Sequence, residues 1–329
     1  MTNSERYRAA FGHLHAPADA AQRAQETLEH PAGPAAHAKR RRIKPLIAAA
    51  AVILVLGGAV GAEAASGEIS NLLAPLYGGS QTALVDSIGV PLNASVTDNG
   101  YTLTAEAVLG DRFHFMVVYT LTRDDGEPIP EGVTIQNWEG QHFGSGGGSL
   151  ELFREGLPEN QLRMIESWSG SVPLLGRYYT VTFQNLVRYG GEDHETEELL
   201  GEGTWTLSFA LRFRDCTVKV PLNGTTVTDQ NGGVHTLRQL FISPIGFRVE
   251  LTSPVPDLSP GVYPEGVKMV LRLTDGTLIR LPGGSGSGSW VKGDAYYDAH
   301  MWAGLAPPIP LEDMEAIIFN DVEIPLNLS

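Results

Sequence analysis

Residues 101–121 read YTLTAEAVLGDRFHFMVVYTL, and the fold class follows from this stretch. Apolar residues occupy alternate positions over residues 101–107 and again over 113–121. Because successive side chains of a strand face opposite sides of a sheet, this alternation predicts two half-buried antiparallel strands. The triplet Asp98-Asn99-Gly100 just before them is a tight-turn signal.

The same pattern recurs along the rest of the chain. Trp205 to Phe213 alternates in the same way, and Asp124-Asp125-Gly126 and Asp275-Gly276 mark further turns. Additional strands are predicted over residues 178–187, 247–251, 267–273, 277–281 and 316–324. Many short strands without a long helix indicate a mainly β fold of two antiparallel, immunoglobulin-like β-sandwiches. We expect the first at residues 81–220 and the second at 221–329.

Two segments rich in glycine and serine interrupt this pattern, at residues 144–149 and 283–289. Neither is followed by the Lys-Ser/Thr pair and helix of a phosphate-binding loop. We expect both to be mobile surface loops.

A basic run at residues 39–44 directly precedes the uncharged stretch Pro45 to Ala62. Eighteen helical residues span about 27 Å, close to the thickness of a bilayer core. We therefore expect a single transmembrane helix at residues 45–64. Residues 1–44 carry 8 Lys and Arg against 4 Asp and Glu, and the remainder carries 15 against 34. The positive-inside rule then places the N-terminus in the cytoplasm and the C-terminal domains outside the cell.

Two other readings of the apolar stretch remain open. Ala62-Glu63-Ala64 fits the cleavage pattern of a secretory signal peptide, although 38 residues precede Lys39, whereas signal peptides begin close to their charged region. A buried helix of a soluble protein is the other reading, and it is disfavoured by the six-residue basic run at the edge of the stretch.

The cytoplasmic residues 1–44 begin with a helical pattern. Thr2 and Glu5 form a capping box. An apolar stripe flanked by two arginines follows, and the predicted docking residues for a cytoplasmic partner are Tyr7, Phe11, Leu14, Arg6 and Arg8. On the other side of the span, residues 65–80 predict a short amphipathic stalk helix beside the membrane.

Composition limits the function classes. The chain of 329 residues has a net charge of −15, which argues against direct nucleic-acid binding. With Cys216 as the single cysteine, an intramolecular disulfide and a cysteine-based zinc site are excluded. We expect no cofactor.

The sequence shows no hydrolase or metalloprotease motif, so we expect no enzyme activity. Asp111 and His114 lie three residues apart, and in an extended strand their side chains would face opposite sides of the sheet. The acidic stretch 192–198 lacks the spacing of a calcium loop and is interpreted as a solvated loop.

The tryptophans divide into two groups. Trp205 falls on the apolar face of its strand and is predicted to be core. A possible outer recognition patch is formed by aromatic residues near the second glycine-serine segment, namely Trp290, Tyr296, Tyr297 and Trp302.

Several short stretches of the sequence resemble the DUF4179 family of Gram-positive bacterial membrane proteins, which are often described as anti-sigma-factor-like. They occur at residues 4–11 (SERYRAAF), 88–89, 99–104 (NGYTLT), 108–111 and 242–246 (ISPIG), around the basic-flanked membrane segment. The resemblance implies a partner, an extracytoplasmic-function sigma factor, sequestered by the cytoplasmic segment. It implies no catalytic residues.

These observations predict a single-pass membrane regulator that binds a sigma factor inside and senses a signal outside through its sandwiches. An outer event, by proteolysis at the 66–80 linker or by conformational change, would alter the availability of the inner helix. The alternative is a membrane-anchored surface-binding or adhesion protein. A secreted enzyme is a third class, for which no nucleophile or metal constellation is visible.

Overall fold

The computed structural model describes residues 68–77, 82–144, 146–190, 196–229, 232–254, 267–281, 286–290, 296–305 and 307–328. The predicted cytoplasmic segment and the predicted membrane span lie outside these ranges. Within them, no helix combines the length and hydropathy needed to cross a bilayer. The described chain is mainly β, with antiparallel sheets, as the alternation predicts.

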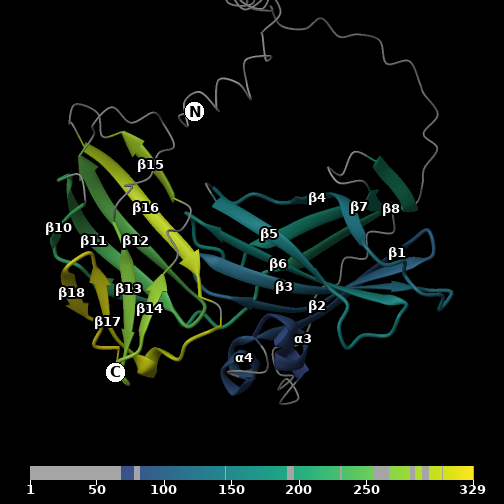
Figure 1. Cartoon of the computed structure of the whole chain (residues 1–329), viewed down its shortest axis with the longest axis horizontal. Coiled ribbons are helices and arrows are strands. Elements are labelled where there is room, and N and C mark those ends of the chain that lie inside the picture. The colour runs from purple at the N-terminus through teal and green to yellow at the C-terminus, as the bar shows by residue number, and fades with distance from the viewer. Residues whose placement is uncertain are drawn as a thin grey trace, which may run out of the picture. The chain divides into compact units, whose positions relative to one another are not determined.

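The first sandwich consists of two facing sheets (Figure 1). The larger sheet has the order β1-β2-β3-β6-β5, with β1 at Val90–Asp98, β2 at Tyr101–Gly110, β3 at His114–Arg123, β6 at Gln161–Gly170 and β5 at Gly146–Phe153. The smaller sheet has the order β4-β7-β8, with β4 at Val133–Gly140, β7 at Tyr178–Gly190 and β8 at Thr196–Ala210.

The core of this sandwich lies between the two sheets. Tyr119 of β3 and Phe183 of β7 meet with ring centroids 5.1 Å apart. Trp205 is fully buried, as predicted, and its Nε1 donates a hydrogen bond to the carbonyl of Tyr101. The predicted turn at Asn99 and Gly100 is confirmed, because both residues have positive φ, as a tight hairpin turn requires.

Two helices cover the outer face of the larger sheet, α3 at Glu68–Tyr77 and α4 at Thr82–Ile88. Leu73 is fully buried and Ile69 nearly so. They pack in one cluster with Leu109 of β2 and Val118 of β3. The helical part of the segment expected to be a stalk, α3, therefore packs on the first sandwich as an additional layer. The reason is that the outer face of this sheet is apolar and buries the apolar side of α3.

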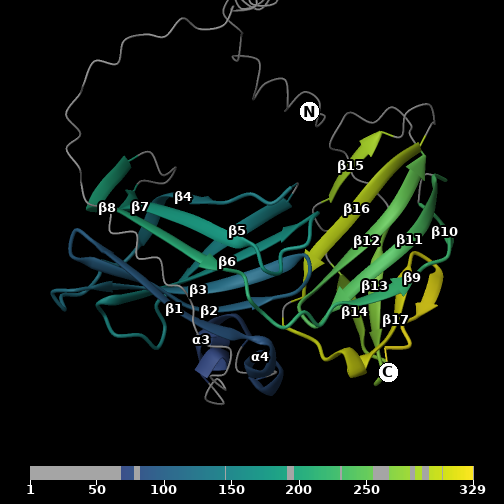
Figure 2. The ribbon, with the colours of Figure 1, turned by 180° about the vertical axis from the view of Figure 1, so that it is seen from behind.

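The second sandwich also has two sheets (Figure 2). One sheet has the order β10-β11-β12-β16-β15, and β9 also pairs with β11. Its strands are β9 at Val218–Pro221, β10 at Thr226–Thr228, β11 at Val234–Ser243, β12 at Gly246–Pro254, β15 at Gly286–Trp290 and β16 at Tyr296–Gly304. The other has the order β14-β13-β17-β18, with β13 Met269–Leu273, β14 Leu278–Leu281, β17 Met314–Phe319 and β18 Val322–Pro325. A 3-10 turn at Leu311–Asp313 precedes β17.

The two sandwiches repeat one strand plan. The larger sheet of the first, β1-β2-β3-β6-β5, corresponds in chain order to β10-β11-β12-β16-β15 of the second. The smaller sheet, β4-β7-β8, corresponds to β13-β17-β18, and the second sandwich adds β9 and β14. Equivalent hairpins even share a bulge, between Ala105 and Ala107 in β2 and between Leu237 and Gln239 in β11. The described chain is therefore a tandem of two units with the same topology.

In residues 146–149 and 286–289, the glycine-serine segments belong to edge strands rather than loops, so the loop prediction is wrong there. Gly146–Phe153 forms β5, the equivalent Gly286–Trp290 forms β15, and each is the last strand of its sheet. In β5, a side chain on Gly146 would lie 2.4 Å from the Trp168 ring. Small residues occur there because the indole of the neighbouring strand fills the space that a side chain would need.

Candidate functional site

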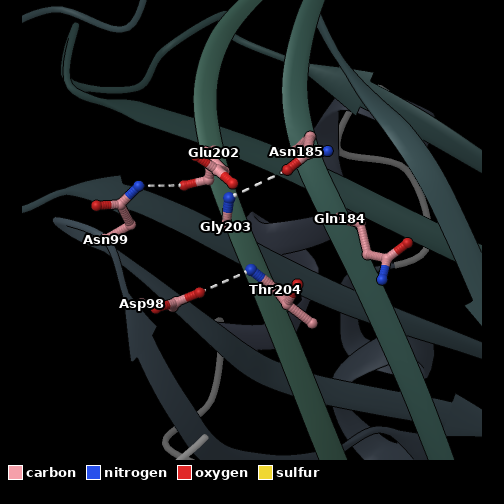
Figure 3. A pocket seen from close by; sticks show the side chains of 7 residues that line it. All are labelled: Asp98, Asn99, Gln184, Asn185, Glu202, Gly203 and Thr204. Atoms are coloured by element: carbon pink, nitrogen blue, oxygen red, sulfur yellow. Dashed lines mark hydrogen bonds between the residues drawn. The ribbon is translucent and has the colours of Figure 1, made fainter. Parts of the chain in front are cut away.

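A polar pocket lies where the β1–β2 turn meets the long β7–β8 hairpin (Figure 3). Its volume is about 490 Å³. The lining residues are Asp98, Asn99, Gln184, Asn185, Glu202, Gly203 and Thr204. All but one carry polar side chains, so the pocket suits a hydrophilic ligand.

A bulge in the β7–β8 hairpin shapes one wall. The register shifts between Gln184 and Leu186, and Asn185 has φ of 53°. The Asn185 amide holds this backbone in place: its Oδ1 accepts a hydrogen bond from Gly203 N at 3.2 Å, and its Nδ2 donates to Gln136 at 2.7 Å. Asparagine suits the site because it tolerates positive φ.

The β1–β2 turn forms the opposite wall. Asp98 Oδ2 accepts a hydrogen bond from Thr204 N at 2.7 Å. Asn99 Nδ2 donates to the carbonyl of Glu202 at 2.6 Å. Both residues lie more than 100 positions from their partners in the chain. Hydrogen bonds within the protein therefore hold both walls of the pocket in place without a ligand (Figure 3).

Three polar side chains of the lining have no hydrogen bond to another described residue: the Gln184 amide, the Glu202 carboxylate and the Thr204 hydroxyl. All three are exposed and available to a ligand.

A second polar cluster joins the two sandwiches. Asp111 Oδ1 accepts hydrogen bonds from the backbone N of Phe113 and of His114, each at 2.7 Å, and His114 Nδ1 lies 2.9 Å from the same carboxylate. The expectation that Asp111 and His114 face opposite sides is wrong. Residues 111–113 form a turn rather than a strand, and the turn brings the two side chains together.

Ser243 of the second sandwich completes this cluster by donating a hydrogen bond from Oγ to Asp111 Oδ2. All three residues are at least 96% buried. Burial by itself would raise the pKa of Asp111, but the charge of His114 and the hydrogen bonds from His114, Ser243 and Phe113 lower it overall. Because Ser243 donates to the carboxylate rather than to His114, the arrangement differs from that of an activated serine nucleophile.

Aromatic and basic side chains extend the junction. Phe113 of the first sandwich and Phe241 of the second meet edge to face, with centroids 5.1 Å apart. Arg248 lies over Phe113 with Cζ 4.4 Å from the ring centroid, and its Nη1 donates a hydrogen bond to the carbonyl of Ser171. The junction thus combines a buried charge cluster with a cation–π contact.

One carboxyl group lies in the middle of the first core. Glu166 is fully buried and accepts hydrogen bonds from the phenols of Tyr119, at 2.6 Å, and Tyr179. Burial raises its pKa to about 7, against the lowering effect of these phenols. Tyr119 belongs to the larger sheet and Tyr179 to the smaller one, so the carboxyl bridges both layers.

The predicted partner-binding residues Tyr7, Phe11, Leu14, Arg6 and Arg8 lie outside the described residues. The predicted outer patch is distributed along one strand pair. Trp290 of β15 pairs with Tyr297 of β16, and Tyr296 is the next residue. Trp302 pairs with Arg248, five strand residues or about 17 Å farther along.

The acidic stretch 192–198 is described only at its end. Glu197 accepts a hydrogen bond from Gln136, and Glu198 forms an ion pair with Arg188. In the described part of the chain, no group of three or more His, Cys, Asp or Glu side chains is arranged to hold a metal ion.

Sequence reasoning missed the pocket. The available signal was the pair Asn99 and Asn185, because asparagine is the residue that most readily adopts positive φ after glycine. Nothing in the sequence connects the two positions, which come together only through the stacking of the two sheets.

Comparisons with known proteins give little identity. No protein-family model matches the chain. No curated protein matches it either. Among solved structures, "the crystal structure of the conserved domain protein from Bacillus anthracis" is similar with a TM-score of 0.43 and 13% identity, over 73% of this chain and 92% of that one.

Proposed function

We propose that this protein is a single-pass membrane regulator whose outer sandwiches sense a signal and whose cytoplasmic segment sequesters an extracytoplasmic-function sigma factor. The membrane span, the orientation and the sigma-factor partner rest on the sequence: the basic-flanked apolar stretch, the capped apolar stripe and the DUF4179 resemblance. The described outer region adds a route by which a signal could reach the membrane.

The observation that carries the proposal is the position of α3. This helix begins four residues after the expected membrane span, and its buried face belongs to one hydrophobic cluster with strands β2, β3 and β6. The same cluster contains Ile245, from the β11–β12 turn of the second sandwich. A change at the junction would therefore disturb the packing of the helix that leads to the membrane.

The strand order supports the interpretation of the outer units as immunoglobulin-like. The order β2-β3-β6-β5 facing β4-β7-β8 is that of a seven-stranded constant-type immunoglobulin sandwich, with β1 as an added edge strand. The β7–β8 hairpin corresponds to the one that carries a binding loop in antibody variable domains. The polar pocket adjoins this hairpin.

The test is co-purification of the tagged full-length chain from membranes of its native host. We expect a sigma factor with the wild type and not with a Tyr7→Ala, Phe11→Ala, Leu14→Ala variant, because the apolar stripe would be removed. The matched control is Gln22→Ala, Gln25→Ala, Thr27→Ala in the same segment, which should retain the partner. Equal recovery with all three chains would contradict the docking stripe.

The second candidate is a membrane-anchored surface-binding or adhesion protein, and the polar pocket favours it. Under this function the N-terminal 44 residues are an anchor only. Deletion of residues 1–30 would then leave cell-surface binding and every transcript unchanged, whereas the regulator predicts increased transcription of sigma-dependent genes after the deletion.

A further inference from the structure

We infer that the pocket between the β1–β2 turn and the β7–β8 bulge binds a cationic hydrogen-bond donor, an ammonium or guanidinium group. The inference rests on the proposed sensing function and names the chemistry of the outer ligand. It follows from the two carboxylates of the lining and from the polar atoms that the structure leaves unpaired there.

Structural hydrogen bonds engage one amide N–H of each asparagine in the pocket. Asn99 Nδ2 is directed to the Glu202 carbonyl, and Asn185 Nδ2 to Gln136. The backbone N–H groups of Gly203 and Thr204 are occupied by Asn185 and Asp98. The acceptors left for a ligand are the Glu202 carboxylate, the second oxygen of Asp98, and the side-chain carbonyls of Asn99 and Gln184. The Gln184 NH2 group and the Thr204 hydroxyl are left as neutral donors. Because the charged groups of the lining are both carboxylates, a cation is favoured over an anion.

The charges in the pocket act in the same direction. Asp98 and Glu202 bring two negative charges, and the lining contains no Lys or Arg. The nearest arginine on the hairpin, Arg188, is held by Glu198 through Nε at 3.0 Å. The chain as a whole is strongly acidic, which adds long-range attraction for cations.

Geometry favours an organic cation over a metal ion. Calcium requires six to eight oxygen ligands at about 2.3–2.6 Å. The Asp98 and Asn99 side chains are held by bonds to β8, and the described residues contain no group of three ligating acids, histidines or cysteines. The volume of about 490 Å³ accommodates a guanidinium together with the chain that carries it.

The experiment uses the full-length chain in lipid nanodiscs at about 0.15 M salt, where diffuse surface attraction is screened. The probe is a fluorescent Gly-Arg-Gly-Arg-Gly peptide followed by anisotropy, with unlabelled spermidine and calcium chloride as competitors. If spermidine displaces the labelled peptide at a lower concentration than unlabelled peptide does, the ligand is a polyamine. If the unlabelled peptide displaces it at the lower concentration, the ligand is a basic peptide. Either order supports a cation site if the variants below behave as stated.

We expect Glu202→Gln to weaken peptide binding about tenfold, the usual size of a charge-assisted hydrogen bond. Gln184→Lys should abolish binding, because its own ammonium group would occupy the pocket. The control Glu312→Gln removes the same charge from an exposed position in the second sandwich and should change affinity less than twofold. Thermal unfolding of each variant checks that the fold is retained.

Equal weakening by Glu202→Gln and Glu312→Gln would overturn the inference, because attraction would then be a property of the whole acidic surface. Displacement of the peptide by micromolar calcium in the wild type but not in Glu202→Gln would also overturn it in favour of a metal site. Both results are independent of sigma-factor co-purification, so failure here is distinguishable from failure of the proposed function.

Discussion

Ser243 donates a hydrogen bond to Asp111, although 132 residues separate them and they belong to different sandwiches. Their positions are equivalent in the repeated strand plan. Asp111 and His114 close the β2–β3 hairpin, as Ser243 and Gly246 close the β11–β12 hairpin. The two equivalent turns thus meet, and Gly246 leaves room for His114, whose ring lies 2.5 Å from where a Cβ would be.

We predict that Asp111→Ala lowers the free energy of unfolding by about 3 kcal/mol or more, because it leaves Ser243, His114 and two backbone N–H groups without their acceptor in a buried site. Urea denaturation of the full chain measures this. The control Asp321→Ala, in an exposed turn, should change stability by no more than about 0.5 kcal/mol. Similar values for both variants would mean that the junction cluster contributes nothing.

Glu166 predicts a pH dependence of stability. Its pKa is about 7 in the folded chain and 4.5 for the ordinary side chain, so between these values the folded state binds more protons than the unfolded state. Stability should therefore fall as pH rises from about 4.5 to 7, by roughly 3 kcal/mol in total. Glu166→Gln should remove this part of the slope. Parallel stability curves for wild type and Glu166→Gln, measured by urea denaturation at successive pH values, would exclude the effect.

Gly140 makes room for the Tyr179 phenol beside Glu166. A Cβ at Gly140 would lie 2.0 Å from Tyr179 Oη and 3.1 Å from Glu166 Oε1. Gly140→Ala should therefore destabilise the chain by about 1–3 kcal/mol through overpacking. Gly304→Ala is the matched control, since its nearest neighbour would be a carbonyl oxygen at 3.6 Å, an ordinary contact. The measurement is the shift of the urea midpoint, and equal shifts would contradict the crowding argument.

The α3 layer gives a further prediction. Leu73 is fully buried against the first sandwich, so Leu73→Ala should lower the free energy of unfolding by about 2–5 kcal/mol. Asn71→Ala, on the exposed side of the same helix, should change it by no more than about 0.5 kcal/mol. Limited proteolysis should release a fragment cut within 68–81 from the Leu73 variant earlier than from wild type. Unchanged cleavage would show that this helix is not protected by its packing.

The strands and several turns could be predicted from the sequence because they depend on local chemistry. Alternation identifies β2, β3 and β8, and Asn99-Gly100 identifies a turn, since only such residues adopt its positive φ at low cost. The glycine-serine segments were predicted to be loops because glycine is typical of loops. In the first segment the reason for glycine is the Trp168 ring on the neighbouring strand, which occupies the space that a side chain would need.

The sequence by itself determined that residues 81–329 are mainly β, that Trp205 is core, and that an apolar stretch with a basic flank precedes them. Only the tertiary structure decided the pairing of Asp111 with His114 and Ser243, the repeat of one strand plan, and the pocket formed by residues near 98 and near 185 and 203. The physical reason is that alternation is a property of each strand alone. Sheet order, stacking and the meeting of two turns depend on contacts between residues about 100 positions apart, which no local pattern encodes.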